Sequence, residues 1–199
     1  MIETINSETL IQQYSQIGSQ YNCKEELPRQ VFKHAKYYMV IDIEAFLYND
    51  LKDTISFSKY EKSTELIWLP HINKEKANSI IKLNLLKEIK SNISYSLIDF
   101  FEEKDLLFSL LEYGCLFNDK KNWIAQFSTE LGFVVIGVFE KNCQLSSWLK
   151  SEPYTKEGFL REYQTFQDDY VNISEKEAHK YILANNNNII YPMIKNYFD

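Results

Sequence analysis

The feature that most constrains the fold is a nearly continuous apolar run at residues 133–139. A strand with one face in water alternates apolar and polar side chains, whereas an apolar run of strand length is typical of a strand inside a sheet. We therefore predict a central strand over 132–140. Gly137, in the middle of this strand, predicts a bulge or a close neighbour. The run is far too short to cross a lipid bilayer.

Shorter segments with strand composition surround this run. Residues 64–69 alternate apolar and polar side chains, and so do residues 54–60. The residues between them, 61–63, predict a hairpin that Pro70 ends. Two further strands are expected at 37–43 and 123–128, with a turn at 118–121.

Helices are expected where apolar residues recur every three or four positions. The segment 94–113, closed by Gly114, has the longest face of this kind. Residues 73–90 fit both a helix and a strand, and their length and their content of Lys and Glu favour a helix. An opening helix is expected to begin after Asn6 or Ser7 as cap, to bury Leu10, Ile11, Tyr14 and Ile17, and to end at Gly18. Two further helices are expected at 44–51 and 159–170. A last helix is expected at 174–184, where Ser174 and Glu177 form a capping box.

The end of the chain combines a polar and an apolar segment. Four asparagines at 185–188 predict a loop, and the apolar tail at 189–198 is expected to pack on the body of the protein. The chain has no internal repeat and no Pro-rich or Gly/Ser-rich linker. We therefore predict one α+β domain over residues 1–199, with an antiparallel or mixed sheet and several packed helices.

The charge is acidic and unevenly distributed. The formal net charge is -6, from 28 acidic and 22 basic residues. Residues 1–99 have 13 acids against 12 bases, whereas residues 100–199 have 15 against 10. No local basic patch is visible in the sequence, so we expect no direct contact with nucleic acid or with a membrane. The excess of acids in the second half favours a basic partner.

The sequence also bears on the compartment. Residues 1–10 lack a basic cluster followed by an apolar core, so no secretory signal is predicted. Cys23, Cys115 and Cys143 are odd in number and widely spaced, which is typical of reduced, buried thiols. We expect a cytoplasmic protein. Lys outnumbers Arg twenty to two, which is typical of an AT-rich bacterial or phage genome.

Most cofactor and catalytic signatures are missing. The five glycines, at 18, 114, 132, 137 and 158, are too far apart for a phosphate-binding loop, a dinucleotide fingerprint or a nucleophile elbow. His34, His71 and His179 show no zinc-ligand spacing. We therefore expect no cofactor and no metal in the main interpretation.

The alternative interpretation is an enzyme centred on Asp42 and Glu44. They follow an apolar lead-in, and alternation on a strand would place both carboxylates on one face, where they could bind Mg²⁺ or Mn²⁺. This pattern resembles the first acidic motif of the DEDD exonucleases, which implies a metal-dependent nuclease or phosphodiesterase. In that family small residues follow the acids, whereas Ala45, Phe46 and Leu47 follow here.

A second acidic pattern involves Glu88 and Lys90, separated by one residue. It resembles the Glu-x-Lys of restriction-type nucleases, with Glu65 as an upstream acid. In a Lys-rich segment the same triplet is typical of a charged helix surface, which is the interpretation we favour.

The remaining candidate is an acidic and aromatic segment of 19 residues in the second half of the chain. Its carboxylates could meet a basic partner quickly and in a salt-sensitive way, while its rings supply contact area. Alternatively, the rings belong to the core and the acids only keep the surface hydrated. The candidate partner-binding residues are Glu152, Tyr154, Glu157, Glu162, Tyr163, Asp168, Asp169 and Tyr170.

Together these patterns favour a non-enzymatic, intracellular inhibitor of a basic partner such as a toxin or nuclease. The likeness to immunity proteins, antitoxins and phage inhibitors is one of type, based on size, acidity and aromatic content. A third interpretation is a structural subunit whose aromatic residues serve self-association.

Overall fold

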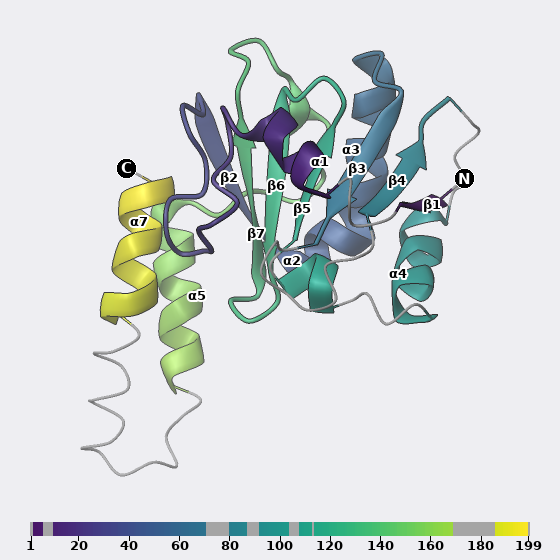
Figure 1. Cartoon of the computed structure of the whole chain (residues 1–199). Helices are drawn as coiled ribbons and strands as arrows, with labels where there is room; N and C mark the ends of the chain where they lie inside the picture. The colour runs from purple at the N-terminus through teal and green to yellow at the C-terminus, as the bar shows by residue number, and fades with distance from the viewer. Residues whose placement is uncertain are drawn as a thin grey trace.

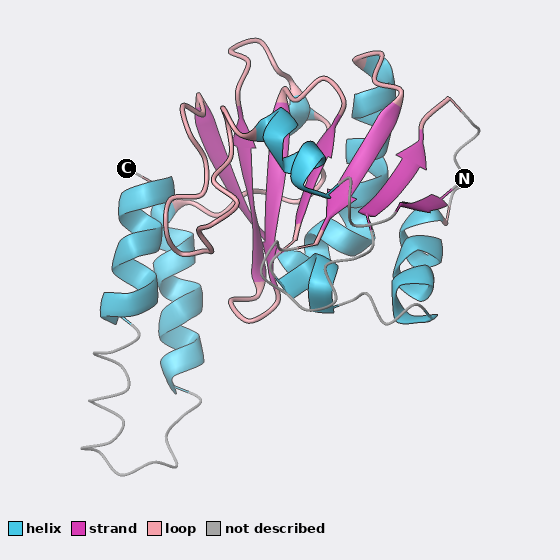
Figure 2. Cartoon of the chain, viewed as in Figure 1, coloured by secondary structure: helices cyan, strands magenta, loops and turns pink. Residues whose placement is uncertain are grey.

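An antiparallel sheet with helices on both faces forms the body of the protein (Figures 1 and 2). The computed structural model describes residues 2–5, 10–70, 80–86, 92–103, 108–112, 114–168 and 186–198. These residues form seven strands in the order β1-β4-β3-β5-β6-β7-β2. The strands are β1 (Ile2–Ile5), β2 (Tyr37–Asp42), β3 (Glu65–Leu69), β4 (Ile80–Asn84), β5 (Cys115–Asn118), β6 (Trp123–Ser128) and β7 (Phe133–Val138). The α+β class predicted from the sequence is confirmed.

The apolar run is an internal strand, as predicted. All six residues of β7 are buried, and the strand pairs with β6 on one side and with β2 on the other. Gly137 has the close neighbour that its position predicted, because a Cβ there would lie 2.9 Å from the ring of Phe32. The segment that precedes β2 therefore crosses directly over β7.

One helical layer covers the face of the sheet that carries Trp68. Trp68 stacks on Phe127 at 4.8 Å and meets Phe101 edge-on at 4.9 Å, joining β3, β6 and a helix in one core. The layer consists of α2 (Ile43–Ala45), η2 (Phe46–Asp50), α3 (Leu51–Tyr60), α4 (Ile93–Glu103) and η3 (Phe108–Glu112), with the short η4 (Leu145–Ser147).

A second layer covers the opposite face. Its core contains Tyr14, Tyr21, Phe32 and Phe159, packed on residues of β2, β3 and β5 to β7. The layer consists of α1 (Leu10–Ile17), the segment 18–36, α5 (Lys156–Asp168), η5 (Asn186–Ile190) and α7 (Tyr191–Tyr197). Figure 1 shows α1 in front of the sheet and α5 beside α7 near the β2 edge. None of the described helices is long and apolar enough to cross a bilayer.

Two predicted elements have the wrong type. Residues 54–60 belong to α3 rather than to a hairpin strand, because Leu51, Thr54, Ile55 and Ser58 form a buried face with helical spacing. Residues 80–84 form β4 rather than part of a helix. Ile80 packs in one core and Ile81 in the other, as in a strand covered on both faces. The rest of the predicted helix, 73–79 and 87–90, lies outside the described residues.

Smaller differences concern element ends. Ile11 is 72% exposed, although Leu10, Tyr14 and Ile17 are buried as predicted. Residues 186–188 are helical, in η5, rather than a loop. The expected caps Asn6 and Ser7, and the helix over 174–184, lie outside the described residues.

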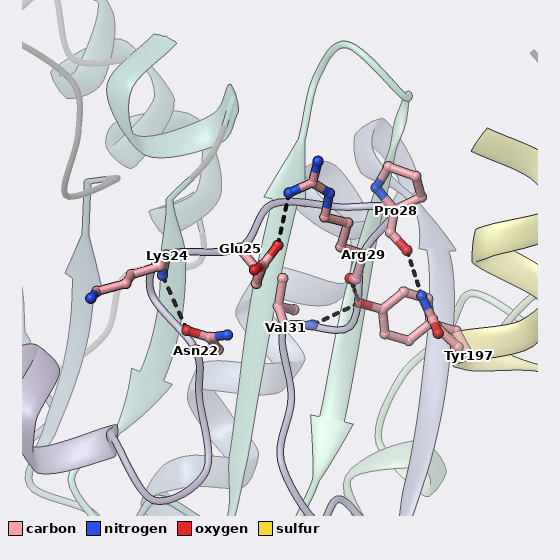
Figure 3. Close-up of polar contacts among 8 residues, drawn as sticks. Asn22, Lys24, Glu25, Pro28, Arg29, Val31 and Tyr197 are labelled. Carbon is pink, nitrogen blue, oxygen red and sulfur yellow. Dashed lines mark hydrogen bonds and ion pairs between the residues drawn. The ribbon is translucent and has the colours of Figure 1, made fainter. Parts of the chain in front are cut away.

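The C-terminal tail packs on the body, as predicted, and Tyr197 anchors it (Figure 3). Its hydroxyl donates a hydrogen bond to the carbonyl of Arg29 and accepts one from the N–H of Val31 at 3.1 Å. Its ring lies edge-on to Tyr38, at 5.3 Å. Asn196 adds a bond from Nδ2 to the carbonyl of Pro28 at 2.9 Å. The tail and the 28–31 segment therefore stabilise each other.

Replacing Tyr197 by phenylalanine should lower the free energy of unfolding by about 1–3 kcal/mol, because the buried N–H of Val31 loses its partner. Urea unfolding measures the loss, and amide hydrogen exchange should become faster at Val31. The control is Tyr191→Phe on the exposed side of the same helix, which should change the free energy by less than about 0.5 kcal/mol. Equal effects of the two substitutions would contradict the conclusion that the Tyr197 hydroxyl anchors the C-terminal tail.

Candidate functional site

Asp42 ends β2 and starts the helix that follows. Its Oδ1 accepts a hydrogen bond from the N–H of Ala45 at 2.8 Å, so the carboxylate caps α2. Glu44 lies in that helix and is exposed. The prediction that strand alternation places both carboxylates on one face is therefore wrong, because the strand ends between them.

The described residues contain no group of three His, Cys, Asp or Glu side chains placed to hold a metal ion. Glu65, the upstream acid of the second nuclease pattern, instead pairs with Lys82 on the neighbouring strand at 3.3 Å. Glu88 and Lys90 lie outside the described residues, as do His71 and His179. The three cysteines are free, and Cys115 and Cys143 are buried as expected.

The acidic and aromatic segment begins at the outer edge of the sheet. The N–H of Tyr154 donates to the carbonyl of Val40 at 2.8 Å, on the side of β2 that faces away from β7. Tyr154 is half-buried, and its ring meets Phe159 edge-on at 6.4 Å. Phe159 is buried, and its ring contacts those of Phe133 and Phe198. One ring of the segment thus belongs to the core, and Tyr154 lies between core and surface.

Asp50 fixes the chain just before this segment. It is fully buried at the end of η2, and its Oδ1 accepts hydrogen bonds from the N–H groups of Lys150 at 2.7 Å and Ser151 at 3.1 Å. Lys150 also pairs with Asp53 at 3.2 Å. These contacts hold the start of the acidic segment against the helical layer.

The carboxylates gather around Tyr154. Burial raises the pKa of its hydroxyl, and the nearby negative charges of Glu162 and Asp42 raise it further. Asp42, which the alternative interpretation used, therefore lies beside the acidic segment. The N–H of Ile43 donates to the carbonyl of Gly132 at 3.0 Å, which brings the turn between β6 and β7 to the same place.

We call this surface the acidic end. It lies where β2 and β6 finish and β7 begins, and Figure 1 shows this end of the sheet at the bottom. Lys156 and Arg161 are the basic residues within 152–162. The acidic end consists of Asp42 and Glu162, which lie near Tyr154, together with the exposed acids of the adjoining segments, Glu44, Glu130, Glu152 and Glu157.

The predicted partner-binding residues are only partly accounted for. Glu152, Glu157 and Glu162 are exposed, and Tyr154 is half-buried. Tyr163 and Asp168 belong to α5. Asp169 and Tyr170 lie outside the described residues.

Two exposed rings that no sequence pattern indicated lie close together elsewhere on the surface. Tyr48 of η2 is 47% exposed and Tyr95 of α4 is 59% exposed, and their ring centroids are 5.6 Å apart. Tyr48 follows Glu44 by four residues in a helical stretch, so this aromatic pair adjoins the acidic end. The two rings are far apart in the chain, and only the packing of η2 on α4 brings them together.

The fold is that of an antiparallel α+β protein, and its candidate site is an exposed, charged surface. No family model matches the chain, and comparisons with curated proteins and with solved structures give no significant match.

Proposed function

We propose that the protein is a non-enzymatic binding protein that occludes a basic protein partner with its acidic end. This is the mode of action of the immunity, antitoxin and phage-inhibitor type. The observation that carries the proposal is the approach of carboxylates from two separate parts of the chain to Tyr154: Asp42 at the β2–α2 junction and Glu162 of α5.

The chemistry of this surface supports binding. Clustered carboxylates attract Lys and Arg side chains and accelerate the encounter with a positively charged cleft. Tyr48 and Tyr95 next to this end add exposed apolar area with hydrogen-bonding tips. Asp50 and the bond from Tyr154 to Val40 hold the acidic segment in place, which lowers the entropy lost on binding.

The test uses the purified basic proteins encoded by neighbouring genes as candidate partners. We expect one of them to bind the wild-type protein tightly, with an association rate that falls as salt rises. A triple charge reversal, Glu152→Lys, Glu157→Lys and Glu162→Lys, should reduce that rate by about tenfold or more. Stopped-flow fluorescence and calorimetry give the rate and the affinity.

The matched control reverses three acids that belong neither to the acidic end nor to the surroundings of Tyr95: Glu25→Lys, Glu103→Lys and Glu140→Lys. Its change in net charge is identical, so a specific site predicts a much smaller effect. The proposal fails if none of the neighbour-encoded proteins binds, or if both triple variants weaken binding equally.

A further inference from the structure

The end of the sheet opposite the acidic end carries a row of lysines. Strand register places the start of β2, β3 and β6 and the finish of β5 and β7 at this end, since Leu66 pairs with Asn118, and Trp123 and Tyr37 both pair with Val138. Figure 1 shows these turns at the top of the sheet. The row, which we call the lysine rim, consists of Lys33, Lys36, Lys59, Lys62, Lys120, Lys121 and Lys141.

The lysine rim reverses the charge of the protein locally. Six of its lysines are exposed and Lys121 is half-buried. The same turns contain three acids, Glu61, Asp119 and Glu140, so this end has four more positive than negative charges in a chain of net charge -6. This local excess is not visible along the sequence, because four separate segments contribute to it.

The turns of the rim are braced against one another. Asp119 accepts hydrogen bonds from the N–H of Thr64 at 3.2 Å and from its hydroxyl at 3.0 Å, which ties the β5–β6 turn to the turn before β3. Burial acts to raise the pKa of Asp119, but these bonds outweigh it and hold the pKa below its ordinary value. Gln20 links the 18–36 segment to the same turn through its bond to the carbonyl of Lys121 at 2.9 Å.

Backbone conformation gives a second, independent observation. The non-glycine residues with positive φ in the described part of the chain are His34 at 62°, Lys62 at 59° and Lys121 at 59°, and all three lie at this end. A residue with a Cβ loses about 1–2 kcal/mol in this region, where glycine or asparagine is favoured. Because histidine is itself enriched in this region, the argument concerns Lys62 and Lys121, which occupy two positions where stability alone favours glycine or asparagine. Their presence there supports a use for the side chains themselves.

The dimensions and the rings of the rim indicate the ligand. Five adjacent strands, about 4.8 Å apart, make the row about 19 Å long, enough for several consecutive phosphates. Tyr60, between Lys59 and Lys62, is 63% exposed, and its ring lies 5.5 Å from that of Trp148. Lysines along a backbone track with an exposed ring for a base are the elements of a single-strand site. An arginine fork for reading base edges is absent from these turns.

We propose that the lysine rim binds single-stranded nucleic acid without sequence preference, through phosphate contacts to its lysines and base stacking on Tyr60. This surface is separate from the acidic end, so its test stands apart from that of the proposed function.

The experiment measures fluorescence anisotropy of labelled oligo-dT and oligo-rU of about 16 nucleotides as salt is varied. The rim variant is Lys62→Asn, Lys121→Asn and Lys141→Gln. We expect it to lose at least about tenfold in affinity and to lower the slope of log K against log salt by about 2. Because asparagine tolerates positive φ, its free energy of unfolding should be unchanged or higher. Loss of binding then cannot be attributed to unfolding.

Two controls match these changes. Lys24→Gln, Lys52→Gln and Lys195→Gln remove the same charge away from the rim and should keep wild-type affinity. Tyr60→Ala should weaken binding at least about fivefold with little change in salt slope, whereas Tyr191→Ala, at an equally exposed ring on α7, should not.

Several results would overturn the proposal. One is equal binding by the rim variant and the lysine control. Another is binding of heparin, duplex DNA or phosphatidylserine vesicles as tight as that of the oligonucleotides and indifferent to Tyr60→Ala. A third is the absence of oligonucleotide binding together with a salt-sensitive self-association that the rim variant loses. That result would mean that the lysine rim binds the acidic end of a second copy.

Discussion

Gly114→Ala is expected to lower the free energy of unfolding by about 3 kcal/mol or more, the largest loss from any glycine-to-alanine change in the described chain. An added Cβ would lie 2.2 Å from the carbonyl oxygen of Leu110 and 2.7 Å from that of Leu69. Both are backbone atoms, so no side-chain rotation relieves the clash. Leu110 also accepts a hydrogen bond from Nε1 of Trp68 at 3.0 Å, and Leu69 pairs with Cys115 in the sheet. Any relief must disturb η3 or the β3–β5 pairing.

Urea denaturation of the purified variant measures this loss. Gly158→Ala is the matched control, because the nearest atoms to its added Cβ are side-chain atoms of Thr155 at 3.3 Å and Tyr154 at 3.8 Å. Position 158 lies in α5, where alanine is favoured over glycine by up to about 1 kcal/mol. We expect this variant to be as stable as the wild type or slightly more stable. If Gly114→Ala unfolds at the same urea concentration as Gly158→Ala, the conclusion that backbone atoms leave no room for a Cβ at position 114 is contradicted.

Gly114 also shows what local sequence patterns predict well. The glycine was expected to close a helix, and it does follow η3, because helix ends have strong local signals. The central strand at β7 was predicted for a similar reason, since a nearly continuous apolar run of strand length favours an internal strand. Neither inference needs knowledge of distant residues.

The two elements whose type was predicted wrongly have apolar patterns that fit both the two-residue repeat of a strand and the 3.6-residue repeat of a helix. In residues 54–60 the apolar positions satisfy both alternation and helical spacing, and the preceding helical residues 46–53 decided the outcome. In residues 80–84 apolar side chains point to both faces because both faces of β4 are covered, and β4 itself pairs with β1 and β3. The length of a charged segment favoured a helix there, but the neighbouring strands override local preference.

The candidate surfaces were harder to predict because each combines distant residues. The link between Asp42 and Tyr154 depends on the edge of β2 accepting the later segment. The lysine rim depends on the register of the strands, which cannot be read from local sequence patterns. Charges counted along the chain revealed the acidic excess of the second half but concealed the lysine rim, whose residues are spread over four segments.

The protein is expected to lose stability steeply above about pH 10, because several buried groups cannot ionise in the folded state. Tyr14, Tyr21 and Tyr197 are at most 5% exposed, and Cys115 is fully buried. The three phenols donate hydrogen bonds to the carbonyl of Pro70, to Oε1 of Gln126 and to the carbonyl of Arg29, respectively. A phenolate cannot donate these bonds, and it would have no water around it.

Burial is the main cause that raises the pKa of each of these four groups. For Tyr14 and Tyr21 a charge on neighbouring Cys115 would raise the pKa further, whereas the polar contacts of the Cys115 thiol with both phenols partly offset the effect of burial on the pKa of Cys115. The unfolded chain releases these protons near the ordinary values, 9.0 for Cys115 and 10.0 for the tyrosines. Above those values the unfolded state binds fewer protons than the folded state, so stability falls as pH rises.

Each group then lowers the free energy of unfolding by up to about 1.4 kcal/mol per pH unit. The stability that each group contributes is fully present only below the pKa that the group has in the unfolded chain. Above about pH 10 the four groups together remove up to about 5 kcal/mol per pH unit, which is a large part of the whole stability of a typical domain. Urea unfolding at a series of pH values between about 8 and 11 measures the slope. Phenolate absorbance gives an independent readout, because the buried tyrosines should ionise only as the protein unfolds.

Tyr14→Phe distinguishes this mechanism from general repulsion between negative charges at high pH. The variant loses the bond to Pro70, at a cost of about 1 kcal/mol at neutral pH. Its stability should then fall less steeply above pH 10, by about 1.4 kcal/mol per pH unit. Tyr60→Phe removes a phenol that is exposed in both states and should leave the slope unchanged. Identical slopes for Tyr14→Phe and Tyr60→Phe would mean that charge repulsion, rather than the buried phenol under α1, drives the alkaline transition.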